Sequence, residues 1–199
     1  MLPRANSTAT MKPMRRASRF AVVLAAFLAP ALATAQSEPS LRIEHDEARD
    51  AMAVHASIDI AASPQIVFGV ITDCNRAPKF VPNLESCRIL HKDPNGRWEV
   101  RETILNITML PRIRAVSRSE IEPPRRFAFH KVGGDMRISE GAWRLEPIAK
   151  GKATRVHYDA LFALNYPVPR FLVQSAAYRD IPTLMKGVER ESLEDAAKR

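Results

Sequence analysis

Six strand-length segments follow one another between residues 85 and 164, and this succession constrains the fold more than any other feature of the chain. Short sequences such as "DPNG", "EPPR", "GGD" and "AKGK" separate them and carry the residues that turns favour. Successive strands joined by turns this short pair antiparallel. The run predicts an antiparallel sheet made of the segments 85–92, 97–108, 112–122, 126–133, 140–148 and 154–164.

A further strand and a helix precede these six segments in the sequence, and a second helix follows them. Residues 53–62 ("AVHASIDIAA") alternate apolar with polar side chains, which is the period of a half-buried strand. Ser63 and Pro64 then suit the N-cap and the first position of a helix. Residues 169–199 have helical spacing, and Pro182 is expected to kink or split that helix. This order predicts an α+β domain in which the last helix packs across a curved antiparallel sheet of about seven strands.

The N-terminal segment, residues 1–35, has the three parts of an export signal. A basic stretch precedes an apolar run at residues 20–32, and the small residues Ala33 and Ala35 provide a cleavage pattern before Gln36. The apolar run is too short for the ~30 Å hydrocarbon core of a bilayer. The segment therefore predicts a cleaved signal peptide and a periplasmic or secreted protein. The alternative is a buried N-terminal helix.

The charge of the chain depends on this signal. The chain holds 30 Lys and Arg against 22 Asp and Glu, but residues 1–35 contain five of these bases and no acid, which leaves 25 against 22. Residues 36–199 therefore lack the excess of basic residues that is typical of a nucleic-acid-binding protein, so no nucleic-acid partner is expected. No repeat or linker divides it. We predict an N-terminal extension at 36–52 and one domain at 53–199.

Three motifs carry a resemblance to a known family. They are the Ala-Ser-Pro entry to the first helix with the Thr-Asp pair at its end, the Gly-x-Trp-x-Leu strand around Trp143, and the Thr-x-Val-x-Tyr strand ending at Tyr158. With these motifs, residues 53–192 resemble the START-like (helix-grip, SRPBCC) superfamily, in its branch of polyketide cyclase/dehydrase and coenzyme Q-binding proteins. The resemblance implies a deep apolar cavity between the sheet and the final helix, which holds a lipid, a quinone or another hydrophobic small molecule. Cys74 departs from the pattern, because such families show an aromatic residue there.

Large side chains on the faces that we expect to turn inward are the candidate ligand contacts. Strand parity places Tyr158 and Phe162 on one face of the last strand, and Phe171 and Tyr178 lie seven residues apart on the final helix. Such a set either packs into a solid core or encloses a ligand, and the residues leave both possibilities open. The candidate ligand-binding residues are Trp143, Tyr158, Phe162, Phe171, Tyr178, Phe129, Ile104 and Glu102.

Catalytic motifs are absent from the sequence, which has no metalloprotease, serine-hydrolase or nucleotide-binding signature. The five histidines show no metal-ligand spacing, so we expect no metal, no cofactor and no assigned catalytic residue. Glu102 is the one carboxylate on an otherwise apolar strand face. Burial in a cavity would raise its pKa and allow it to act as an acid or to orient a ligand. The alternative is a Glu102 at the strand end that pairs with an arginine.

Cys74 and Cys87 are the only cysteines of the chain. Export would place them in an oxidising compartment, and a metal-binding pair would normally bring further ligands with it. A disulfide between them would close a short loop and tether the end of the first helix to the next strand. We favour this bridge, and the alternative is two reduced, buried cysteines whose Cα atoms lie too far apart to join.

A basic strand face is formed by Arg112, Arg114 and Arg118. A solvated surface is the default interpretation, and a weak contact with an anionic membrane surface is the functional alternative.

Three functions are compatible with these features. The favoured hypothesis is an exported carrier or chaperone of a hydrophobic small molecule. An enzyme of the cyclase or dehydratase type would use the same cavity and would need a polar group inside it. An interaction module would have a collapsed cavity and would bind no small molecule.

Overall fold

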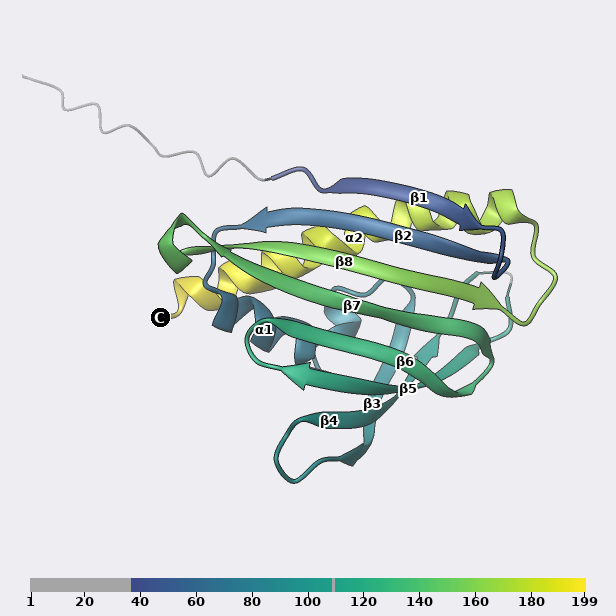
Figure 1. Ribbon diagram of the computed structural model, residues 1–199, viewed down its shortest axis with the longest axis horizontal. Coiled ribbons are helices and arrows are strands. Elements are labelled where there is room, and N and C mark those ends of the chain that lie inside the picture. The colour runs from purple at the N-terminus through teal and green to yellow at the C-terminus, as the bar shows by residue number, and fades with distance from the viewer. Residues whose placement is uncertain (1–36, 109) are drawn as a thin grey trace, which may run out of the picture. The chain divides into compact units, whose positions relative to one another are not determined.

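The computed structural model describes residues 37–108 and 110–199, and Figure 1 shows a curved sheet with the long helix α2 behind it. The eight strands are antiparallel and lie in the order β1-β2-β8-β7-β6-β5-β4-β3. The α+β helix-grip class is therefore confirmed. The elements are β1 (Ser40–Asp46), β2 (Ala51–Ile60), α1 (Pro64–Thr72), η1 (Ala77–Lys79), β3 (Leu84–Lys92), β4 (Trp98–Leu105), β5 (Ile113–Glu122), β6 (Arg126–Gly134), β7 (Met136–Ile148), η2 (Ala149–Gly151), β8 (Ala153–Leu164) and α2 (Arg170–Ala197).

The six predicted strand segments correspond to β3 through β8, each pairing with the next along the chain. The turn sequences separate them at the expected places because they supply residues that reverse the chain locally. The strand predicted at residues 53–62 is β2, which pairs with β8. Helix α1 begins at Pro64 after Ser63, as predicted.

The strand β1 was not predicted from the sequence. Its residues were assigned to an N-terminal extension, 36–52, but they pair with β2 along the sheet edge, with Ile43 opposite Val54. Ile43 is buried, and the alternate side chains of β1 are exposed or half-buried. The folded sheet therefore begins at Ser40, and it has eight strands where about seven were expected.

Of the kink or split expected at Pro182, the split does not occur, because helix α2 continues through this residue as one element. Proline removes one backbone hydrogen bond from the helix interior. Two turns on the C-terminal side of Pro182 are held by buried residues, among them Leu184, Met185 and Val188. We infer that this burial outweighs the loss of the single bond.

The core lies between one face of the sheet and the helices α1 and α2. It combines residues of α1 and α2 with inward-facing residues of β2, β7 and β8. Gly187 lets α2 approach the loop before β3, because a Cβ atom there would lie 2.7 Å from Cβ of Phe80.

The helices of the described ranges include none that is long and apolar enough to cross a membrane. The predicted export signal at residues 1–35 lies outside these ranges.

Candidate ligand-binding cavity

A cavity of about 340 Å³ lies between the sheet, α2 and the loop that joins α1 to β3. Its walls are mainly apolar, and they come from β3 through β8 as well as from the two segments that cover the sheet. Four of the predicted ligand-binding residues line it: Phe129, Trp143, Tyr158 and Phe162.

The strand register explains why these four residues meet. Phe127, Trp143 and Tyr158 lie opposite one another on β6, β7 and β8, so their side chains point to the same face. The ring centroids of Trp143 and Tyr158 are 4.3 Å apart. Phe129 and Phe162 each lie further along the same faces of β6 and β8. Because successive residues alternate between faces, the parity prediction is correct for these strands.

The parity prediction was wrong for β4. The residues that face the cavity are Arg101, Thr103 and Leu105, whereas Glu102 and Ile104 do not line it. Glu102 accepts hydrogen bonds from Arg114 at 2.5 Å and from Arg88 at 2.8 Å.

These two hydrogen bonds hold the pKa of the Glu102 carboxyl below its ordinary value, opposite to the rise expected for a carboxyl inside a cavity. Glu102 therefore has no place in the cavity chemistry.

Phe171 and Tyr178 were also placed wrongly. Their exposed fractions are 68% and 49%, and neither lines the cavity. Met185, seven residues after Tyr178, lies on the same side of α2 and is fully buried. Burial in α2 begins at Ile181, so the turns that hold Phe171 and Tyr178 precede the buried part of the helix.

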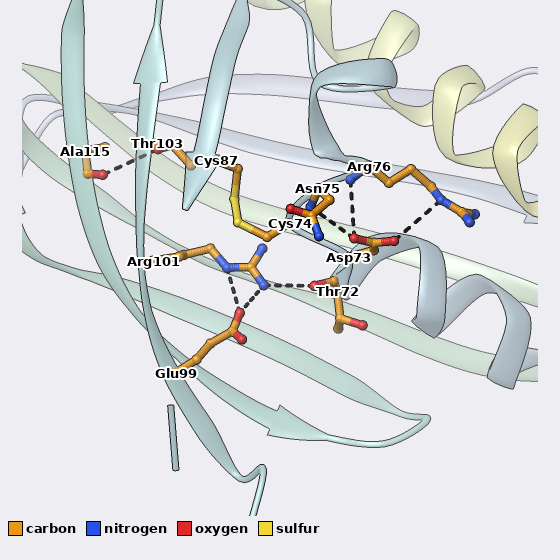
Figure 2. Close-up of a disulfide and its surroundings, with 10 residues drawn as sticks. All are labelled: Thr72, Asp73, Cys74, Asn75, Arg76, Cys87, Glu99, Arg101, Thr103 and Ala115. Atoms are coloured by element: carbon orange, nitrogen blue, oxygen red, sulfur yellow. Dashed lines mark hydrogen bonds and ion pairs between the residues drawn. A yellow bond between two sulfur atoms is a disulfide. The ribbon is translucent and has the colours of Figure 1, made fainter. Parts of the chain in front are cut away.

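A buried ion pair occupies the inner face of β4. Arg101 Nε donates to Glu99 Oε1 at 2.7 Å, and Arg101 Nη2 donates to the same oxygen and, at 3.0 Å, to the carbonyl oxygen of Thr72 (Figure 2). The guanidinium also lies 4.7 Å from the centre of the Phe127 ring, within the range of a cation–π contact. Arg101 thus brings hydrogen-bond donors to the cavity wall while Glu99 balances its charge.

Buried hydroxyl groups extend this polar region. On β5, Ser117 lies opposite Arg101 and Ser119 lies opposite Glu99, and both serines line the cavity. Ser119 Oγ is buried and has no hydrogen-bond partner among the described residues. Burial raises the pKa of the Tyr158 hydroxyl far above its usual value, so this group stays protonated at neutral pH. The cavity can therefore offer hydrogen bonds to a polar group without carrying an unbalanced charge.

The predicted site residues did not include Glu99, Arg101, Ser117 and Ser119. Charged residues in a strand normally face solvent, so the apolar side chains of β4 were expected to point inward. Polar residues occupy three alternate positions of β4, at Glu99, Arg101 and Thr103. This spacing was a signal that the face opposite Ile104 is polar. The structure places that face inside because the two charges neutralise each other and Thr72 accepts a further bond.

The loop between α1 and β3 forms one wall of the cavity, with Phe80 among its contributing residues. A disulfide joins Cys74 to Cys87, with their Cα atoms 5.4 Å apart, as the sequence analysis favoured (Figure 2). A second link is the hydrogen bond from Asn83 Nδ2 to Asp180 Oδ2 of α2, at 3.0 Å. The loop is thus attached both to the sheet and to the helix that close the cavity.

The predicted basic face is largely balanced by acidic side chains. Arg112 pairs with Glu85, Arg114 with Glu102 and Arg118 with Glu120. Since each arginine has a carboxylate within salt-bridge distance, the face offers less positive charge to an anionic membrane than the sequence suggested.

The histidines of the outer sheet face also pair with acids. His55 Nδ1 lies 2.6 Å from Asp159 Oδ1, and His157 Nε2 lies 3.7 Å from Glu146 Oε2. Within residues 37–108 and 110–199, no group of three or more His, Cys, Asp or Glu side chains could hold a metal ion.

Truncation of the cavity wall should separate stability from binding. Phe162→Ala is expected to reduce the free energy of unfolding by less than Phe68→Ala, since Phe68 is buried in the core and its loss costs about 3 to 5 kcal/mol. Phe162→Ala should also weaken retention of a hydrophobic fluorescent probe. Urea midpoints and probe titrations measure the two effects.

Phe171→Ala is the matched control, because an exposed side chain should change stability by no more than about 0.5 kcal/mol and leave the probe bound. If Phe162→Ala lowers the free energy of unfolding by as much as Phe68→Ala and leaves probe binding unchanged, the Phe162 side chain itself fills the cavity.

Comparison with known proteins agrees with this architecture. The sequence pattern of the family described as polyketide cyclase / dehydrase and lipid transport matches residues 60–189. A comparison with curated protein sequences gives no match. Three similar solved structures are a STAR-related lipid transfer protein from Xanthomonas axonopodis (14% identity, TM-score 0.66, 78% of this chain and 93% of that one), human STARD10 (11%, 0.66, 79% and 70%) and the Zhui aromatase/cyclase from Streptomyces sp. R1128 (16%, 0.62, 72% and 94%). At these identities the likeness to the structures establishes the fold alone.

Proposed function

We propose that this chain, which belongs to the polyketide cyclase / dehydrase and lipid transport family, is an exported carrier or chaperone of a hydrophobic small molecule such as a lipid or a quinone. The observation that carries the proposal is the cavity of about 340 Å³, whose walls are mainly apolar. Burial of apolar ligand surface there would contribute roughly 25 cal/mol per Å². The polar region at Arg101 and Ser119 would orient the bound molecule by receiving its polar group.

An enzyme of the cyclase or dehydratase type is the second candidate. The observation that favours it is the set of donors inside the cavity, Arg101, Ser119 and Tyr158, because such reactions need a polar group at the reacting atoms. One solved neighbour is named an aromatase/cyclase. We rank this function second, since Glu99 balances the charge of Arg101 and burial raises the pKa of the Tyr158 hydroxyl, which disfavours loss of its proton near neutral pH.

Export remains part of the proposal. Its support is the basic stretch, the apolar run at residues 20–32 and the small residues before Gln36. A disulfide between Cys74 and Cys87 is compatible with an oxidising compartment.

One experiment tests both parts. Native mass spectrometry of the protein isolated from its own cells is expected to give the mass of residues 36–199 plus one bound hydrophobic molecule. Denaturing conditions should then release the molecule and return the mass of the polypeptide alone. A mass that retains residues 20–32 would refute cleavage of the signal. A protein without any bound molecule, which also fails to take up a hydrophobic probe, would favour the interaction module with a collapsed cavity.

A further inference from the structure

A second pocket, of about 390 Å³, lies beside the cavity near the start of α2. Its floor is apolar and includes Met52, Val168 and Val173. Its rim carries charged groups that pair with one another, since Asp50 lies within 3.4 Å of His45, Arg137 and Arg170.

The Asp50 carboxylate is therefore paired at this rim, whereas His45 Nε2 is buried and has no hydrogen-bond partner among the described residues. Most of the surface that the pocket offers to a ligand is apolar.

Three residues line both the cavity and the second pocket: Ile107, Phe162 and Leu164. Phe162 also packs against both hydrophobic clusters of the domain. It is the largest of the three side chains shared by the two spaces, and it is only partly buried. The Phe162 side chain has other staggered rotamers, and a change of rotamer would join the two spaces.

The polar region lies on the other side of the cavity. Ser119 is on β5 and Phe162 on β8, three strands apart in the sheet order. Neighbouring strands are separated by about 4.8 Å, so about 14 Å of sheet lies between these residues. A molecule whose polar group reaches Ser119 and whose other end passes Phe162 must be elongated.

We propose that the cavity and the second pocket form one binding path for an elongated molecule with a neutral polar head, and that Phe162 is the gate between its two parts. The head, a hydroxyl or a carbonyl, binds at Ser119 and Arg101, because Glu99 already balances the arginine. The apolar chain passes Phe162 and ends on the floor of the second pocket. This inference rests on the proposed function and narrows its ligand to a chain-bearing amphiphile, as opposed to a compact polycyclic molecule.

A homologous series of n-alkanols, from octanol to hexadecanol, tests the path by displacement of a hydrophobic fluorescent probe. Affinity is expected to rise by up to about fourfold for each methylene that is buried, and to keep rising for the long members. Alkanoic acids of equal length should bind more weakly than the alcohols, because the head region has no unbalanced positive charge.

Two variants separate the two spaces. Val173→Trp fills the second pocket, so it should abolish the gain in affinity of the long alcohols and leave the short ones unchanged. Phe162→Ala removes the gate and should favour the long alcohols over the short ones more strongly than in the wild type. Phe129→Ala, which changes the cavity alone, should weaken the whole series equally. Val132→Trp, at an exposed position on β6, is the control that should change nothing.

The outcomes distinguish the inference from the function on which it rests. If the short alcohols bind but Val173→Trp affects all lengths alike, or the long members gain nothing in the wild type, the path through Phe162 is wrong and the carrier function stands. If no alcohol displaces the probe and Phe129→Ala leaves probe binding unchanged, the carrier function falls together with the path.

Discussion

Glu99→Gln should lower the free energy of unfolding by about 3 to 5 kcal/mol, the largest effect expected for a single polar substitution in this protein. Glu99 is 3% exposed and accepts two hydrogen bonds from Arg101, itself 9% exposed. Removal of the carboxylate leaves the guanidinium buried without a compensating charge, and the remaining bond to Thr72 cannot replace it. Urea unfolding followed by tryptophan fluorescence gives the change.

Two controls show whether the cost comes from the unpaired charge. The double variant Glu99→Leu/Arg101→Met replaces the pair by apolar side chains and should recover most of the lost stability, because it removes the buried charge together with its partner. Glu102→Gln changes the same chemical group on the outer face of the same strand and should have a much smaller effect. Equal losses for Glu99→Gln and Glu102→Gln would contradict the buried pair.

The second large effect concerns the disulfide. The double variant Cys74→Ala/Cys87→Ala is expected to lose about 3 kcal/mol, because the bridge no longer restricts the unfolded chain. The two cysteines are 13 residues apart in sequence, so the closed loop is short. The urea midpoint of the wild type should fall on addition of a dithiol reductant, whereas that of the variant should not move.

Thiol labelling provides the independent check. Unfolded but unreduced protein from the oxidising compartment should react at neither cysteine, and reduction should expose both. Two reactive thiols before reduction would leave the alternative of separate buried cysteines. Because the bridge attaches the loop that contains Phe80 to β3, its loss should also increase the rate at which a bound probe escapes.

Much of the fold could be predicted from the sequence because its signals are local. Turn residues between the strands fix where each strand ends, and Ser63 with Pro64 fixes where α1 begins. The inward positions of Trp143, Tyr158 and Phe162 followed from alternation along strands whose apolar face is unambiguous. The strand β1 had no comparable signal, since its pairing depends on backbone hydrogen bonds to β2 and on little apolar burial beyond Ile43.

The sequence by itself determined the order of the elements from β2 to α2, the antiparallel sheet with its final helix, and an apolar interior. Only the tertiary structure decided which face of β4 turns inward and which turns of α2 are covered. The physical reason is that both depend on contacts in space, such as the hydrogen bond between Arg101 and Thr72, which are 29 residues apart in sequence. Arg101 can be buried because Glu99 and Thr72 satisfy it in three dimensions, whereas Phe171 stays 68% exposed although Asp50 pairs with Arg170 next to it. Alternation along a chain predicts that two faces exist, but the neighbours in space decide which of them is the inside.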